Sequence, residues 1–220
     1  MIINGDKMIE KPGETAIQRS NIYGLLTLIY RSEVTKALLQ QIREPGFLSA
    51  LSDMGALLDG DFLNRPEDEV IEDLAVEYAR LFIGPDKHIS PHESVHHERE
   101  DGDWGSFWSK STVEVKSFIE ATGLEYKSDF TGMPDHISVE TEFMKVLTAR
   151  ESQAWEEDDK DAAESCRAMQ KKFFDEHISQ WVPGFCDKVI ADAKLDFYRK
   201  IAELTKEFVM EEGRILSGRL

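Results

Sequence analysis

A proline, an aspartate and a histidine stand together where an apolar stripe begins, in the stretch TGMPDHISVETEFM at residues 131–144. In a helix, one face of this stretch would carry His136, Val139, Glu140, Phe143, Val146 and Leu147. In one interpretation, Asp135 caps the helix, where its carboxylate suits the helix dipole, and His136 is an interior imidazole with a hydrogen-bonding partner. In the other, both side chains serve a binding site. The residues alone leave both interpretations open.

Four histidines follow one another closely in the stretch DKHISPHESVHHEREDGD at residues 86–103. Imidazole and carboxylate groups are ligands for zinc and iron, and histidines four residues apart would stack on one face of a helix. Pro91 and the preceding Gly84-Pro85 disfavour such a helix, and neither an HExxH motif nor a neighbouring cysteine accompanies the histidines. The alternative hypothesis is therefore a metal-binding helical protein or enzyme that uses His88, His92, His96 and His97.

Signature motifs of the common enzyme classes do not occur in the sequence. It lacks the GxxxxGK[ST] phosphate loop, the GxGxxG dinucleotide fingerprint and the GxSxG nucleophile elbow. Its two cysteines, Cys166 and Cys186, have no CxxC spacing and suit ordinary thiols in a reducing compartment. We therefore expect a protein without catalytic residues, a resident metal or a cofactor.

Apolar residues recur at three- and four-residue spacing along most of the chain, and strand-like alternation is nearly absent. This pattern predicts helices at residues 17–31, 66–82, 104–122, 136–155, 162–180 and 195–216. Asn64, Pro66 and Glu67 suggest a capping box at the start of the helix that ends at Gly84-Pro85. The polar segment 156–165 indicates an exposed junction between helices. We expect one all-α domain over residues 1–220, with a hinge near residues 125–134.

The charge balance limits the possible partners. The formal net charge is −17, with 41% hydrophobic and 31% charged residues. Nucleic acid is disfavoured because binding its phosphates needs clustered lysine and arginine, whereas a basic partner would be attracted. No apolar run approaches the roughly 18 residues of a membrane span, and the N-terminus has no export signal. The sequence thus predicts a cytoplasmic protein with no integral membrane segment and no nucleic-acid partner.

Three separated segments occur in a recognisable order. They are YARLFIGP at 78–85 followed by SPHESVHHE at 90–98, MPDHISVETEFM at 133–144, and FFDEHISQWVPGFCDKV at 173–189. Together they resemble the TorD family of redox-enzyme maturation chaperones, which includes the TorD, DmsD and NarJ types. The resemblance implies a compact all-α helical bundle of the TorD-like type.

The resemblance also implies a non-catalytic chaperone. Such proteins bind the apo catalytic subunit of a molybdopterin oxidoreductase, often through its twin-arginine signal peptide, and hold it in the cytoplasm until cofactor insertion is complete. A signal peptide of this kind has paired arginines before an apolar segment, so its receptor needs carboxylates beside an apolar groove. Matched motif by motif, the peptide-binding pair is Asp135 and His136 after Pro134, and the groove is lined or supported by Tyr78, Leu81, Phe82, Gly84, Pro85, Glu93 and Ser94.

The segment before the Pro-Asp-His turn departs from the family pattern. Many members have an acidic residue there, whereas this chain has Thr131, Gly132 and Met133, so the expected carboxylate is either missing or replaced by Glu140. Members of the family occur as monomers and as domain-swapped homodimers, and the expected hinge is compatible with either state.

Overall fold

The computed structural model describes residues 11–85, 87–97, 105, 110–124 and 132–218. Within these ranges the chain is all-α, as the periodicity predicts, and extended segments meet only at an isolated antiparallel bridge between His92 and His136. Most of the expected hinge, residues 125–131, and most of the first residues of the expected helix 104–122 lie outside the described residues.

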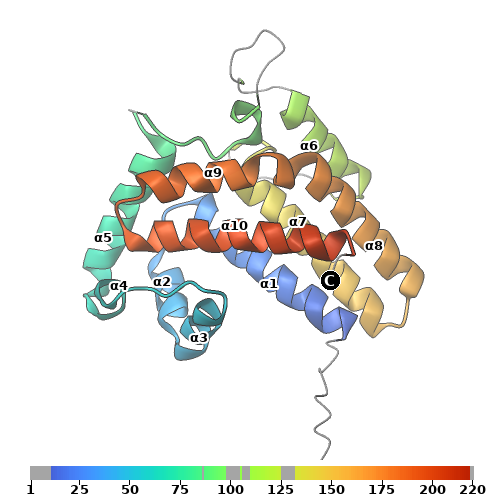
Figure 1. The fold of residues 1–220 in the computed structure, drawn as a ribbon, viewed down its shortest axis with the longest axis horizontal. Coiled ribbons are helices and arrows are strands. Elements are labelled where there is room, and N and C mark those ends of the chain that lie inside the picture. The colour runs from blue at the N-terminus through green and yellow to red at the C-terminus, as the bar shows by residue number, and fades with distance from the viewer. Residues whose placement is uncertain (1–10, 86, 98–104, 106–109, 125–131, 219–220) are drawn as a thin grey trace, which may run out of the picture.

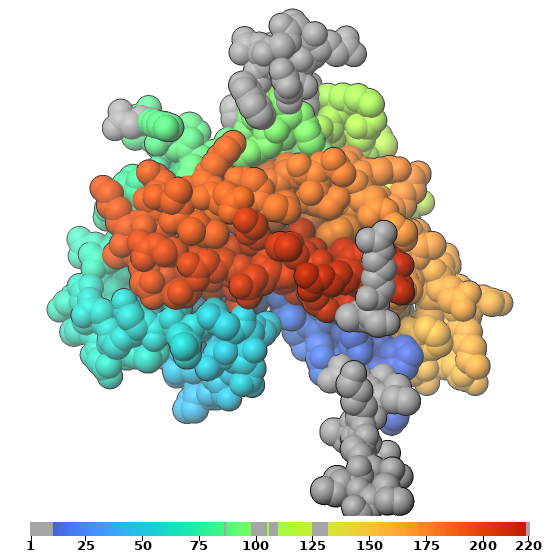
Figure 2. Space-filling model, viewed as in Figure 1, coloured from blue at the N-terminus to red at the C-terminus, as the bar shows by residue number. Residues whose placement is uncertain are grey.

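Two pairs of long helices form the centre of the fold (Figure 1). α1 (Pro12–Arg31) packs along α7 (Ile137–Glu156), and α9 (Ser179–Asp192) packs along α10 (Asp196–Leu216). α8 (Lys160–Phe173) contacts both α7 and α10, and α6 (Lys110–Ala121) lies near the upper end of α8. In the space-filling view, α9 and α10 form a continuous front layer (Figure 2). The junction between α7 and α8 falls in the polar segment 156–165, as predicted.

Shorter helices cover one end of the long ones (Figure 1). They are α2 (Lys36–Arg43), α3 (Pro45–Asp53), α4 (Gly60–Asn64) and α5 (Glu67–Tyr78). The periodicity does not predict α2, α3 and α4, because each is too short to repeat an apolar pattern over several turns. No helix in the described ranges combines the length and the apolar character that crossing a membrane requires.

The expected capping box before α5 is wrong. Asn64 ends α4, where its side-chain amide donates to the carbonyl of Gly60 at 2.7 Å, and it does not cap α5. Pro66 occupies the N-cap position of α5, with no side-chain cap, and Glu67 is the first helical residue. A separate short helix therefore uses the polar residue that the pattern assigned to the longer one.

Two π-helical turns directly follow α-helices. α5 continues into η1 (Ala79–Ile83) and ends at Gly84. Gly84 has a positive φ of 68°, a backbone conformation that residues with a side chain rarely adopt. α8 continues through η3 (Phe174–Ile178) into α9, so the helix predicted to stop at residue 180 runs on to Asp192. Pro183 lies inside α9 and cannot donate a backbone hydrogen bond to the preceding turn. The chain bends between α8 and α9, where the π turn η3 lies (Figure 1).

An aromatic cluster joins α1, η1, α9 and α10 in the core. The ring of Phe82 packs against those of Tyr30, Phe185 and Tyr198 at centroid distances of 6.0, 5.9 and 6.0 Å. All four side chains are at most 5% exposed. Since aromatic rings bury large apolar areas, this cluster fixes η1 against the long helices.

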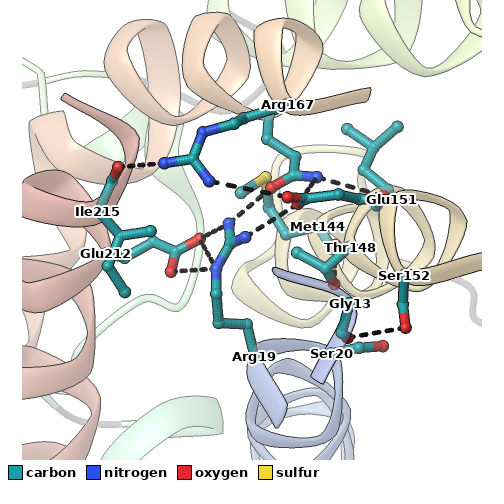
Figure 3. Close-up of polar contacts among 12 residues, drawn as sticks. Gly13, Arg19, Ser20, Met144, Thr148, Glu151, Ser152, Arg167, Glu212 and Ile215 are labelled. Carbon is teal, nitrogen blue, oxygen red and sulfur yellow. Dashed lines mark hydrogen bonds and ion pairs between the residues drawn. The ribbon is translucent and has the colours of Figure 1, made fainter. Parts of the chain in front are cut away.

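A buried ionic network holds the other end of the long helices together (Figure 3). Arg19 of α1 donates through Nε to Glu212 of α10 at 2.8 Å and through Nη1 to Glu151 of α7 at 3.0 Å. It also donates to Gln170 of α8, whose own amide reaches Glu151 at 2.9 Å. Burial alone would lower the pKa of Arg19, but the hydrogen bond and charge of Glu212, with the charge of Glu151, raise it above its ordinary value. The guanidinium therefore stays charged in the interior.

Replacing Arg19 should lower the free energy of unfolding substantially. We expect Arg19→Ala to cost about 3–5 kcal/mol of unfolding free energy, because the buried Glu212 loses its cation and Glu151 keeps only its longer contact with Arg167, at 3.7 Å. The control is Arg214→Ala, whose exposed pair with Glu211 should contribute at most about 1 kcal/mol. Urea unfolding followed by circular dichroism measures both. Equal losses in the two variants would contradict the dependence on Arg19.

Candidate functional site

A groove of about 810 Å³ opens beside the C-terminal end of α1. Its walls come from four parts of the chain that are far apart in the sequence. They are residues 31–35 at and after the end of α1, the Tyr78, Phe82 and Ile83 side chains, residues 88 and 90–92, and Gly132 with His136. The largest part of its exposed lining is apolar.

Aromatic and aliphatic side chains make the floor of this groove. Tyr78 and Phe82 are each 5% exposed, so they present only a small surface to the cavity and bury the rest in the core. The Tyr78 hydroxyl donates to the backbone carbonyl of Tyr30 at 2.9 Å, which ties the floor to the last turn of α1. Ile83 is 59% exposed at the rim. An apolar floor with one large exposed apolar side chain at its edge suits an apolar ligand.

The Pro-Asp-His turn forms a clamp with the loop at residues 91–94. The Asp135 carboxylate accepts through Oδ2 from the backbone N–H of Ser94 at 2.9 Å, and its carbonyl accepts from the N–H of Glu93 at 2.9 Å. The N–H of Ile137 donates to the carbonyl of Pro91 at 2.9 Å. These bonds hold residues 91–94 against the start of α7 and so shape one wall of the groove.

The cap of α7 is His136 rather than Asp135. The Nδ1 atom of His136 accepts from the backbone N–H of Ser138 at 3.1 Å. It therefore carries no proton, and the Ser138 hydroxyl 2.8 Å away can donate to it as well. Burial, followed by the charges of His92 and Arg31, lowers the pKa of His136 to about 3. At neutral pH the groove therefore meets an uncharged imidazole.

A second group of motif residues lies directly behind this clamp. Glu93 accepts from Nε2 of His97 and from Nδ1 of His177, each at 2.9 Å. Burial would raise the pKa of Glu93, but the hydrogen bonds from His177 and His97 lower it below its ordinary value. Glu140 accepts from the Trp181 indole at 3.0 Å, and burial with the nearby charge of Glu93 raises its pKa well above the ordinary value. The two carboxyl groups are thus shifted in opposite directions, Glu93 toward its charged form and Glu140 toward its protonated form.

The structure separates the expected site residues into two sets. Tyr78, Phe82 and His136 line the groove. Leu81, Glu93, Ser94, Pro134, Asp135 and Glu140 are buried in its support, Gly84 provides the turn after η1, and Pro85 follows at the surface. Asp135 and Glu140 are 0% exposed, so neither carboxylate meets solvent in this conformation.

Sequence reasoning missed residues of both sets. The segment 31–35 lies outside every motif, and no pattern connects it with residues 78–136. His177 and Trp181 do lie in the motif HISQWVPGF, and this placement was the available signal for their role beside Glu93 and Glu140.

The four histidines of the loop do not converge. His92 lines the groove, with its ring centroid 4.9 Å from that of His136, and His88 lines it too. His96 donates through Nε2 to the carbonyl of Ser90 at 2.7 Å, and His97 donates to Glu93. Across the residues that the structure describes, no group of three or more histidine, cysteine, aspartate or glutamate side chains could hold a metal ion. The geometry of this loop therefore lends no support to the metal hypothesis.

Both the sequence and the fold are similar to those of known proteins. A family model described as nitrate reductase delta subunit matches residues 42–187. Chaperone protein TorD of Vibrio atlanticus is 26% identical and that of Aliivibrio fischeri 25% identical, each over 91% of this chain and 95% of the relative. A crystal structure described as a redox enzyme maturation protein, from Archaeoglobus fulgidus, superposes with a TM-score of 0.51 at 22% identity. The superposition covers 87% of this chain and 93% of the other, so the two proteins share a fold.

The low pKa of His136 makes stability depend on pH. The unfolded chain binds a proton on this imidazole below its ordinary pKa of 6.5, whereas the folded chain does so only near pH 3. Folding stability should therefore fall as the pH drops from 6.5 toward 3, because the unfolded state binds more protons. His136→Asn keeps a side-chain cap and removes this titration, so its urea midpoint should fall less than the wild-type midpoint between about pH 7 and about pH 4.5.

The matched control is His88→Asn, which removes a histidine from the rim of the same groove. It should leave the acid sensitivity of the wild type intact. An equally steep acid loss in the His136→Asn variant would contradict a buried neutral imidazole at this position.

Proposed function

Because the chain belongs to the nitrate reductase delta subunit family, whose members include the TorD-type maturation chaperones, we propose that it is a chaperone for a molybdopterin oxidoreductase. It binds the apo catalytic subunit in the cytoplasm, assists cofactor insertion and delays export until the subunit is mature. The first contact is with the twin-arginine signal peptide of that subunit. The family is one of maturation proteins, and the relatives are chaperones rather than enzymes.

The groove beside α1 carries this proposal. It is large enough for several side chains, and residues of two family motifs line it. Its floor of Tyr78, Phe82 and Val34 offers apolar contact to the hydrophobic part of a signal peptide. Ser90 and His92 at the side add polar groups that can bond the backbone of an extended peptide.

The clamp between Asp135 and Ser94 supports the same role indirectly. A flexible loop at residues 88–92 would lose conformational entropy when a peptide orders it, and this loss weakens binding. The buried hydrogen bonds of Asp135 fix the loop before any ligand arrives. In this proposal, the Pro-Asp-His turn contributes to affinity through the shape of the groove, and His136 contributes directly as part of its wall.

Charge favours the same kind of partner. The chain carries a formal charge of −17, and a segment with paired arginines is attracted to it over long range. Added salt should weaken the complex, since part of this attraction is screened Coulomb energy.

We further propose that residues 1–220 act as one chaperone domain. α1 packs along α7, and residues of α1, α7, α8 and α10 share the Arg19 network. The N-terminal and C-terminal parts of the chain therefore depend on a common interior.

A pair of matched substitutions tests the groove. Ile83 at its rim and Val76 on α5 are both exposed β-branched residues, at 59% and 66%, but only Ile83 lines the cavity. We expect Ile83→Arg to weaken binding of a synthetic peptide with an arginine pair before a leucine-rich segment by about tenfold or more, because it adds bulk and a like charge. Val76→Arg adds the same charge elsewhere and should have little effect. Fluorescence titration of the labelled peptide measures both affinities.

Two outcomes would count against the proposal. If the wild-type protein binds neither this peptide nor an apo molybdoenzyme subunit, the chaperone function itself fails. If the peptide binds and Ile83→Arg weakens it no more than Val76→Arg, the function stands and the groove is not its site.

A further inference from the structure

We propose that Glu33 is the residue that accepts an arginine of the client peptide in the groove. This inference rests on the function proposed above and names a specificity-determining residue that lies outside every family motif in the sequence. Three observations carry it: the availability of carboxylates, the position of Glu33 at the end of α1, and the neutralisation of the basic groups nearby.

The carboxylates expected from the motifs are not available to a ligand. Asp135 is 0% exposed and accepts from Ser94, and Glu140 is 0% exposed and accepts from Trp181. Glu93 is 1% exposed and is held by two histidines. Bringing an arginine to any of them would require opening the clamp. Glu33 is exposed, and among the described residues that line the groove it is the one carboxylate.

The position of Glu33 also favours a cation. α1 ends at Arg31, and the chain leaves it in an extended conformation at Ser32, so Glu33 stands beside the C-terminal end of a long helix. The aligned peptide dipoles place partial negative charge at this end, which attracts cations. Among the described residues, no ion pair engages the carboxylate of Glu33.

The floor of the groove lies within the field of this carboxylate. Burial, with the charge of Glu33 in addition, raises the pKa of Tyr78 to about 12. Tyr78 and Phe82 offer aromatic surface in the same cavity. A guanidinium paired with Glu33 can therefore rest against an aromatic ring, an arrangement that suits arginine better than lysine because the guanidinium is planar and weakly hydrated.

The other charged and titratable groups of the groove do not cancel Glu33. Arg31 donates to Glu142 of α7 at 2.6 Å, so its charge is already paired. Burial lowers the pKa of His92, and it lowers that of His136 to about 3, which leaves both imidazoles neutral at neutral pH. His88 lies in the wall as well. Because Arg31 is paired and the imidazoles of His92 and His136 are neutral, Glu33 determines that the groove attracts a cationic ligand at neutral pH.

The test is a double-mutant cycle between protein and peptide. The probes are a synthetic peptide with an arginine pair before a leucine-rich segment and the same peptide with both arginines replaced by glutamine. We expect Glu33→Gln to weaken binding of the arginine peptide by about tenfold and to leave binding of the glutamine peptide nearly unchanged. The salt dependence of the arginine peptide should become shallower in the same variant.

The matched control is Glu72→Gln, which removes the same charge from an exposed position on α5 that does not line the groove. It corrects for the change in net charge, and neither substitution touches the core. If Glu33→Gln weakens the arginine peptide no more than Glu72→Gln does, or weakens both peptides equally, the inference is wrong while the proposed function remains. Failure of the wild-type protein to bind the arginine peptide removes the inference together with the peptide-binding function.

Discussion

The hydrogen bond from the Ser94 backbone to the buried Asp135 carboxylate is the contact on which the groove depends. It joins two segments that are 41 residues apart in the sequence and holds residues 91–94 at the start of α7. Residues 88 and 90–92 form one wall of the cavity, and this bond, with the two neighbouring backbone bonds, holds that wall in place. An acceptor buried this deeply is costly to leave without its donor, so the two segments form a single structural unit.

The same unit continues into the core through hydrogen bonds between buried carboxyl groups and aromatic-ring N–H donors. Glu93 neighbours Ser94 in the chain and is bonded to His177 of η3, and Glu140 lies one turn along α7 and is bonded to Trp181 of α9. Buried carboxyl groups need such partners because an isolated charge in the interior is strongly unfavourable. The three motif segments are therefore related physically: each supplies groups that satisfy buried polar atoms of another. The π turn η3 and the bend before Pro183 bring α9 to the place where Trp181 can do this.

The sequence predicted the long helices and part of the site, for reasons that the structure makes clear. Helices such as α1, α7 and α10 bury one face over several turns, which leaves a periodic pattern. The short helices α2 to α4 leave none, and Pro183 would normally end a helix but lies here inside α9. The motifs led to Tyr78, Phe82 and His136 in the groove, but the contribution of residues 31–35 depends on tertiary contacts that no local pattern records.

The residues that shape the groove differ from the exposed residues that the proposed function assigns to ligand contact. Asp135, Glu93 and Glu140 are buried and each is hydrogen-bonded within the fold, so a change at any of them alters the shape of the groove before it alters any contact with a ligand. In the segment after α1, Val34 is buried in the core and Thr35 caps α2, whereas Ser32 and Glu33 are exposed. Under the proposed function, a change at Ser32 or Glu33 would alter contacts with a ligand without disturbing the clamp, whereas a change at the buried carboxyl groups would alter the wall itself.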